Sequence, residues 1–293
     1  MHKGYFSAAW DDIRNSSGWL PKMCLLGLIL CIPVFGAIVV MGYLLGWARE
    51  IAWNVHRPMP ARIFGNEDGN LYKRGLFFLV IGLVFALVPL IVNLLGSILM
   101  DGAKVSTVGV MAANTIFNSS ASLASSLPFL IGGALVTVLS WVLFVLALLF
   151  TWVGSMRSTL YGTLSSGFQM GKIWSMIRYD FPGLARILGM VLLCALIIAV
   201  VVGVIGSLVA VVGAVALGAT AVASFATGGI VGFGIVLVAV LVIALVYIGM
   251  VLFAGTQTLV VRALGYWTRN FEVDKWQGQE DAMPFEQSRA ASN

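Results

Sequence analysis

The sequence predicts an all-α, multi-pass membrane protein. Of its 293 residues, 60% are hydrophobic and only 10% are charged, whereas soluble domains carry about 25% charged residues. The charges leave three gaps of 26, 52 and 75 residues, at 75–100, 105–156 and 187–261. Because about 20 apolar residues suffice to cross the hydrocarbon core as a helix, these gaps must hold membrane spans. We expect a polytopic helix bundle with four full spans, a broken or re-entrant N-terminal apolar segment and three amphipathic interfacial helices.

The first amphipathic helix is expected over residues 5–17. Phe6, Trp10 and Ile13 recur on one helical face, and Arg14 lies with two aspartates on the other. The segment is too short and too polar to span a bilayer, so it predicts a helix lying in the interface.

The first apolar run, residues 23–47, is interrupted by Pro33 and Gly36. Proline removes a backbone donor and clashes with the preceding turn. The run is therefore either one kinked span or a re-entrant hairpin with arms of about 10 to 12 residues, each rising only ~15 to 18 Å. Both of its ends are basic, which favours the hairpin, because the chain would return to the side from which it entered.

Residues 44–76 form the segment around which the rest of the chain is organised. A second amphipathic helix is expected over 44–57, and Pro58 and Pro60 end it. The polar segment 65–70 has the composition of a turn. Lys73 and Arg74 then lie just before the start of the next span.

Four spans are expected at 76–98, 128–154, 184–213 and 231–261. The first contains 17 Leu, Ile, Val or Phe residues and a kink at Pro89. A Ser-, Ala- and Asn-rich loop is expected at 101–127, and an uncharged link of small residues at 214–230. The third amphipathic helix is predicted over 168–181. The polar tail, residues 271–293, is expected to be disordered at its end.

The distribution of basic residues predicts the orientation in the membrane. Of 17 Lys and Arg residues, 16 fall in four segments: the N-terminus, 48–74, 155–186 and the tail; Lys104 is the exception. The positive-inside rule places these segments in the cytoplasm, which predicts a cytoplasmic (inner) membrane protein with both termini on the cytoplasmic side.

The chain also suggests an internal repeat within a single membrane domain, residues 1–270. Trp10, Ile13 and Arg14 match Trp174, Ile177 and Arg178 at one offset of 164. A parallel duplication of about 5–154 and 168–267 would explain the match. The alternative is that Trp and Arg simply favour membrane interfaces.

The order of these motifs resembles a known family. Trp19 leads through an apolar stretch to Gly42-Tyr43, followed by the amphipathic helix, Pro60, a short acidic turn and Gly75-Leu76. This pattern is similar to the uncharacterised prokaryotic membrane family called domain of unknown function 4013, over about residues 4–270. The chain departs from it by carrying Lys73-Arg74 where the family often has an acid. That family has no established activity, so the resemblance implies a fold and no catalytic residues.

The sequence argues against catalysis, metals and cofactors. His2 and His56 lie far apart, and the cysteines Cys24, Cys31 and Cys194 lie within apolar runs. A structural zinc site needs about four clustered ligands, and buried cysteine commonly behaves as a small hydrophobe. We therefore expect no enzyme, no cofactor and no metal.

Polar and small residues inside the spans suggest two further roles. No ionisable residue lies within the expected spans, which argues against a proton-coupled transporter. Asn93, Ser140 and Gln257 would either bond between helices or line a path for a solute. Small residues allow close helix contact, within the monomer or in a dimer; they are Gly203, Ser207, Ala210, Gly228 and Gly232.

Two functions remain after these exclusions. The preferred one is a non-catalytic scaffold or accessory subunit that contacts anionic lipid through five basic residues of the interfacial helices; they are Arg14, Arg49, Arg57, Lys172 and Arg178. The alternative is a permease or channel-like protein for a neutral or lipid-like solute. The expected partners are the lipid bilayer with its anionic lipids and a second copy or another membrane protein, and no nucleic acid.

Overall fold

The computed structural model describes residues 4–64, 69–117, 127–227 and 232–275. Over these residues the chain is helical and contains no strand, which confirms the all-α prediction. Eight α-helices and two short 3-10 helices follow one another in the described part; they are α1 (Tyr5–Arg14), α2 (Trp19–Leu30), α3 (Phe35–Ala52), α4 (Leu71–Phe117), α5 (Leu127–Tyr161), η2 (Ser165–Phe168), α6 (Met170–Tyr179), α7 (Phe181–Thr227), α8 (Gly232–Arg269) and η3 (Val273–Lys275).

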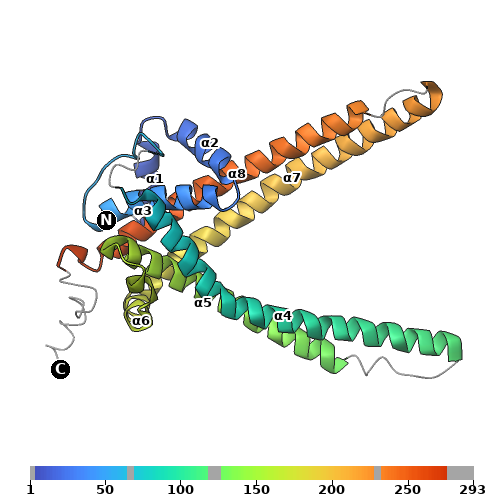
Figure 1. The fold of residues 1–293 in the computed structure, drawn as a ribbon, viewed down its shortest axis with the longest axis horizontal. Coiled ribbons are helices and arrows are strands. Elements are labelled where there is room, and N and C mark those ends of the chain that lie inside the picture. Colours follow the sequence, from blue (N-terminus) through green and yellow to red (C-terminus); the bar gives the residue numbers. More distant parts are fainter. Residues whose placement is uncertain (1–3, 65–68, 118–126, 228–231, 276–293) are drawn as a thin grey trace.

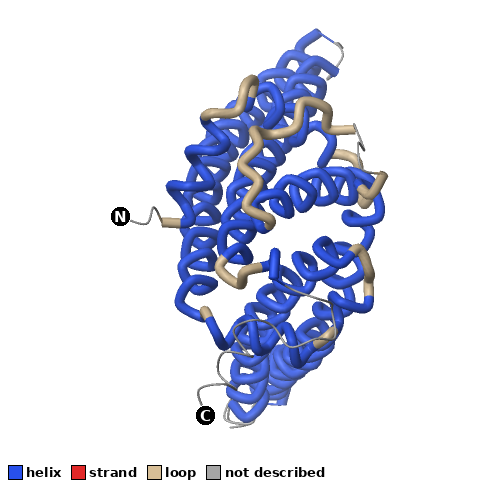
Figure 2. The backbone as a smooth tube through the Cα atoms, turned by 90° about the vertical axis from the view of Figure 1, so that its left-hand side faces the viewer, coloured by secondary structure: helices blue, strands red, loops and turns tan. Residues whose placement is uncertain are grey.

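The long helices form two hairpins, α4 with α5 and α7 with α8, that diverge from a common end (Figure 1). We call these hairpins the arms. The common end, which we call the base, consists of α1, α2, α3 and α6 together with the near ends of the four long helices. Figure 2 looks onto the base, where most of the described connecting loops lie.

Among the described residues, five helices are long and apolar enough to cross a membrane: α3, α4, α5, α7 and α8. The helices α4 and α7 each have 47 residues, a length of about 70 Å at 1.5 Å per residue. The hydrocarbon core is only about 30 Å thick. The arms are therefore long enough to span it with residues to spare, and the protein is a multi-pass membrane protein.

The N-terminal apolar run is broken, as expected, and its two helices form a hairpin. α2 ends at Leu30 and α3 begins at Phe35, after Val34 with a φ of 61°. Early in α2, Met23 lies beside Thr258 of α8, and a Cβ on Gly27 would meet Val251, further from the base. α3 runs the other way, and in its last turns Ala48 lies beside Gly265, close to the base end of α8. The chain thus returns to the end from which it came.

Two segments expected to be loops are helical instead. α4 continues through residues 101–117, and α7 continues through 214–227. Alanine has the highest helix propensity, and no proline interrupts either segment. The remaining parts of both expected loops, 118–126 and 228–230, lie outside the described residues. α4 is also unbroken at Pro89, and its ribbon changes direction part-way along (Figure 1), as a proline kink would produce.

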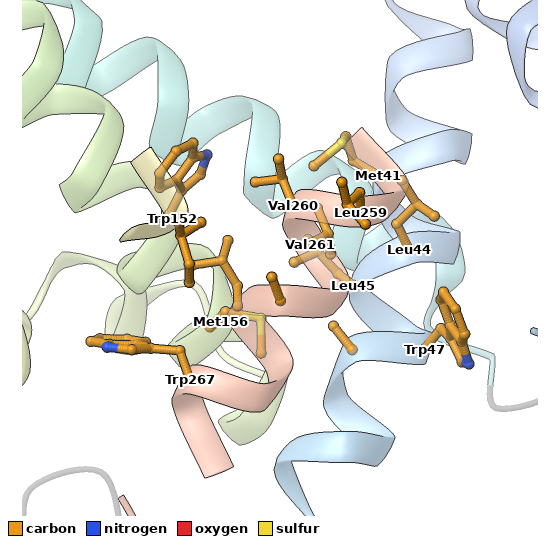
Figure 3. Packing of buried hydrophobic residues seen from close by; sticks show 14 of the residues in the cluster. Met41, Leu44, Leu45, Trp47, Trp152, Met156, Leu259, Val260, Val261 and Trp267 are labelled. Carbon is orange, nitrogen blue, oxygen red and sulfur yellow. The ribbon is translucent and has the colours of Figure 1, made fainter. Parts of the chain in front are cut away.

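The hydrophobic core lies at the base, where α3, α5 and α8 meet (Figure 3). The side chains labelled there come from these three helices; they are Met41, Leu44, Leu45, Trp47, Trp152, Met156, Leu259, Val260, Val261 and Trp267. The arms, in contrast, expose large apolar side chains along their described length, such as Leu94, Leu135, Leu196 and Ile243. This distribution suits arms that are surrounded by lipid.

The expected amphipathic segments differ in how they pack. α1 and α6 are separate ten-residue helices at the base. α1 buries Ala9 and Ile13, and α6 buries Ile173, Met176 and Ile177, while Trp10 and Trp174 are exposed. The segment 44–57 is not a separate helix: its first part is the end of α3, where Trp47 and Ile51 are buried in the core. The duplication of the two halves stays a prediction.

Candidate functional site

Three arginines are buried at the base. The exposed fractions are 7% for Arg74, 0% for Arg157 and 1% for Arg262. Each directly borders one of the three charge-free stretches of the sequence. Buried charges need paired or hydrogen-bonded surroundings, so these positions mark where the polar chemistry of the molecule is concentrated.

Arg262 joins α8 to α1 and α3. Its Nη2 lies 2.6 Å from Asp12 Oδ2, and its Nη1 donates to the Trp47 carbonyl at 2.8 Å. The guanidinium lies 3.9 Å from the centre of the Trp47 ring, within range of a cation–π contact. The Tyr266 hydroxyl donates to the same Asp12 oxygen at 2.8 Å. These contacts hold the N-terminal helix against the end of α8.

A second polar cluster ties the same two ends of the chain to α6 and α7. The Tyr5 hydroxyl donates to Asp180 Oδ2 at 3.2 Å and accepts from Asn270 Nδ2 at 2.6 Å. Trp267 Nε1 donates to the Asp180 carbonyl at 3.2 Å. Burial and the Asp180 carboxylate raise the pKa of Tyr5 above its ordinary value, so Tyr5 is a neutral hydrogen-bond donor at physiological pH.

Arg157 fixes the 3-10 turn after α5. Its Nη2 donates to Gln169 Oε1, and its Nε donates to the Ser166 carbonyl at 3.3 Å. The guanidinium also lies 5.2 Å from the centre of the Tyr161 ring. Arg157 therefore holds η2 against the end of α5 and determines where α6 begins.

The loop after α3 is held in place by side chains from several elements. Three of its backbone carbonyls accept hydrogen bonds from side chains. The Arg57 carbonyl accepts from Trp47 Nε1 at 3.0 Å, the Met59 carbonyl from Lys22 Nζ at 2.9 Å, and the Pro60 carbonyl from the Tyr43 hydroxyl at 2.8 Å. The Met59 N–H donates to Ser16 Oγ at 2.8 Å. The backbone of the loop that carries Arg57 and Arg62 is therefore fixed over α2 and α3.

The helices α3 and α4 cross very closely. A Cβ on Gly42 would collide with the Leu71 carbonyl, and a Cβ on Gly75 with the Ile38 carbonyl. A Cβ on Gly46 would collide with Arg74 Nη1. Glycine at these positions lets the two backbones touch and leaves room for the Arg74 guanidinium against α3.

Beside this crossing is a cavity of about 240 Å³ whose charged lining residues are mainly cationic. We call it the cationic cavity. Its charged lining residues are Arg57, Arg62 and Arg74, with Glu50 as the acid. Glu50 Oε1 lies 3.8 Å from Arg57 Nη1. Arg74 also lines a smaller cavity of about 110 Å³ together with Arg49 and Lys73.

Two other cavities at the base differ in character. An apolar cavity of about 520 Å³ lies between α2 and the loop after α3, lined by Pro21, Leu25, Ile63 and Phe64 together with Lys22, Ala61 and Arg62. A polar cleft of about 770 Å³ lies between α1 and the end of α8. Its charged lining residues are balanced in sign; they are Asp11, Asp12, Arg186 and Arg269.

The five expected lipid-contact residues all lie at the base. Arg14 and Arg178 are exposed on α1 and α6, and Lys172 is half-buried on α6. Arg57 is exposed on the loop after α3, while Arg49 is half-buried beside the smaller cavity. Sequence reasoning missed the roles of Asp12, Arg74, Arg157 and Arg262, although each arginine could have been noticed as the first charge bordering an apolar run.

The three residues of the expected solute path are not gathered around a cavity. Asn93 Nδ2 donates to Ser140 Oγ at 3.0 Å, which joins α4 to α5 within one arm. Gln257 is half-buried on α8, in the other hairpin. None of the cavities described above is lined by any of the three. The Asn93–Ser140 contact is an interhelical hydrogen bond.

The expected small-residue contacts are displaced along α7. Gly203, Ser207 and Ala210 are exposed, and a Cβ on Gly203 would meet no neighbouring atom. The close contacts with α8 are instead at Gly206, near Leu245, and at Gly213, near Val238. Gly228 lies outside the described residues, and Gly232 begins α8. Within one copy, α7 therefore packs on α8 through a neighbouring face, and a dimer contact through Gly203, Ser207 and Ala210 stays a prediction.

The fold defines an α-helical, multi-pass membrane protein whose first apolar run is divided into the α2–α3 hairpin. The family model described as "Protein of unknown function (DUF4013)" matches residues 25–207, more than half of the chain, and the protein belongs to this family. The match extends from α2 into α7, a shorter stretch than the resemblance over 4–270 suggested. No curated protein and no solved structure matches the chain.

Proposed function

We propose that this protein is a non-catalytic scaffold or accessory subunit of the cytoplasmic membrane whose base contacts anionic lipid headgroups. In this proposal the base lies at the cytoplasmic leaflet, with both termini on the cytoplasmic side, and the arms extend toward the other leaflet. The positive-inside rule supports this orientation, because the loops and short helices of the base are rich in Lys and Arg.

The observation that carries the proposal is the position of exposed basic residues on α1 and α6. Arg14 and Arg178 are exposed at the base, on helices that also expose Trp10 and Trp174. Exposed tryptophan and basic residues on one short helix are typical of helices that lie at a membrane surface. Each basic residue near an anionic surface adds about 1 kcal/mol of attraction.

The proposal is tested by the dependence of stability on anionic lipid. The variant combines Arg14→Gln, Lys172→Gln and Arg178→Gln, and the control is Lys104→Gln on the far part of α4. Melting temperatures are compared in phosphatidylcholine nanodiscs with and without phosphatidylglycerol. We expect phosphatidylglycerol to stabilise the wild type and the control, and to stabilise the triple variant much less. An equal gain in all three proteins would contradict the lipid-contact proposal.

A further inference from the structure

We infer that the cationic cavity binds the phosphate of one anionic phospholipid, whose acyl chain lies in the apolar cavity beside α2. This inference rests on the proposed lipid contact and makes it more specific. It concerns one retained lipid molecule in a formed site, whereas the contact through α1 and α6 is with the bilayer surface in general.

The balance of charge in the cavity calls for an anion. Among the described lining residues of the cationic cavity, Arg57, Arg62 and Arg74 face the carboxylate of Glu50, an excess of two positive charges. The smaller cavity adds Arg49 and Lys73 on the other side of Arg74. Like charges held close together in partly desolvated surroundings repel one another, so a bound anion would stabilise this arrangement. Arginine is well suited to phosphate because its planar guanidinium can donate two parallel hydrogen bonds.

The Arg74 side chain and the backbone of the loop that carries Arg57 and Arg62 are held in place. Arg74 is 7% exposed and fits against Gly46, where any side chain would collide with its guanidinium. Arg57 and Arg62 belong to the loop that Trp47, Tyr43 and Lys22 hold through its backbone carbonyls. A preorganised set of donors binds an anion more strongly, because less freedom is lost on binding.

The neighbouring cavity indicates that the ligand is a lipid and not free phosphate. Arg62 lines both the cationic cavity and the apolar cavity of about 520 Å³. The apolar cavity lies along α2, which exposes Leu25 and Leu28. A molecule with a phosphate next to a hydrocarbon chain would fill both spaces at once. The polar cleft between α1 and α8 lacks this combination, because its charges are balanced.

The test compares two double variants with the same change in charge. Arg57→Gln with Arg62→Gln removes two cavity charges from an exposed loop, which spares the buried Arg74. Arg14→Gln with Arg178→Gln removes two exposed charges from α1 and α6. Each full-length protein is purified in a neutral detergent and titrated with phosphatidylglycerol, phosphatidylcholine or glycerol phosphate, and bound molecules are counted by native mass spectrometry.

We expect the wild type and the α1/α6 variant to bind one phosphatidylglycerol preferentially over phosphatidylcholine, and the cavity variant to bind it about tenfold more weakly. Glycerol phosphate should compete poorly, because it lacks the acyl chain. Equal loss in both variants would overturn the inference and leave the general lipid contact in place. Equal binding of glycerol phosphate and lipid would overturn the role of the apolar cavity.

A further variant, Leu25→Trp, should weaken lipid binding without affecting glycerol phosphate, and an unchanged lipid affinity would contradict the acyl-chain placement.

Discussion

Arg262 Nη2 lies 2.6 Å from Asp12 Oδ2, so residues 250 positions apart in the chain form one ion pair at the base. The side chain of Arg262 is 0% exposed and that of Asp12 is 23% exposed. Because the arginine also bonds to the Trp47 carbonyl and lies over the Trp47 ring, three helices meet at this charge. The pair makes the position of the first helix depend on the last one.

Replacing Asp12 should show how much the base depends on this pair. Asp12→Asn leaves Arg262 buried without its carboxylate, and breaking a buried pair costs about 3 to 5 kcal/mol. Because Asp12 is partly exposed, we expect a loss of about 2 to 3 kcal/mol in the free energy of unfolding, measured by denaturant titration in detergent. Glu272→Gln is the control, since Glu272 and Lys275 are exposed and such pairs contribute about 0 to 1 kcal/mol. An unfolding midpoint for Asp12→Asn equal to that of the control would contradict this role.

The crossing of α3 and α4 gives a second prediction. Gly42→Ala places a methyl group against the Leu71 carbonyl, so the helices must separate, at a cost of about 1 to 3 kcal/mol. Gly203→Ala is the matched control, because its methyl group would meet open space and alanine favours helix over glycine by about 1 kcal/mol. Thermal unfolding should therefore move in opposite directions for the two variants. If both raise the melting temperature, α3 and α4 do not cross at Gly42.

Arg157 provides a third prediction. Arg157→Lys keeps the charge but cannot reproduce the forked contacts with Gln169 and the Ser166 carbonyl. We expect the amides of 165–169 to exchange at least tenfold faster with deuterium, since hydrogen bonds to charged groups contribute about 1.5 to 3 kcal/mol. Arg178→Lys, at an exposed position, should leave that exchange unchanged. Equal protection of 165–169 in both variants would remove Arg157 from the support of this turn.

The membrane helices could be predicted from the sequence because they lie where charged residues are absent. The gaps at 75–100, 105–156 and 187–261 contain most of the apolar length of α4, α5, α7 and α8. The interruption at Pro33 also marked the break between α2 and α3 correctly. The ends of the long helices were harder to predict, because residues such as those at 214–227 are small and uncharged. That composition suits a helix as well as a loop.

The candidate site could be predicted only in part. The sequence identifies 44–76 as the segment around which the chain is organised, and this segment supplies the charged lining of the cationic cavity. Sequence could not show that Arg74 turns into the protein while Arg57 remains exposed, because that depends on the space left by Gly46. Nor could it pair Asp12 with Arg262, since no local pattern connects residues so far apart in the chain.

In the proposed orientation, the α2–α3 hairpin returns to its starting side, which brings the basic loops to one face of the membrane. This orientation is tested by Ser17→Cys before α2, Ala61→Cys after α3 and Ser120→Cys between α4 and α5, each in a background with Cys24, Cys31 and Cys194 replaced by alanine. An impermeant thiol reagent is applied to intact and to lysed cells. We expect positions 17 and 61 to react only after lysis, whereas position 120 should react in intact cells. Labelling of position 17 but not position 61 in intact cells would contradict it, because the first apolar segment would then cross the membrane.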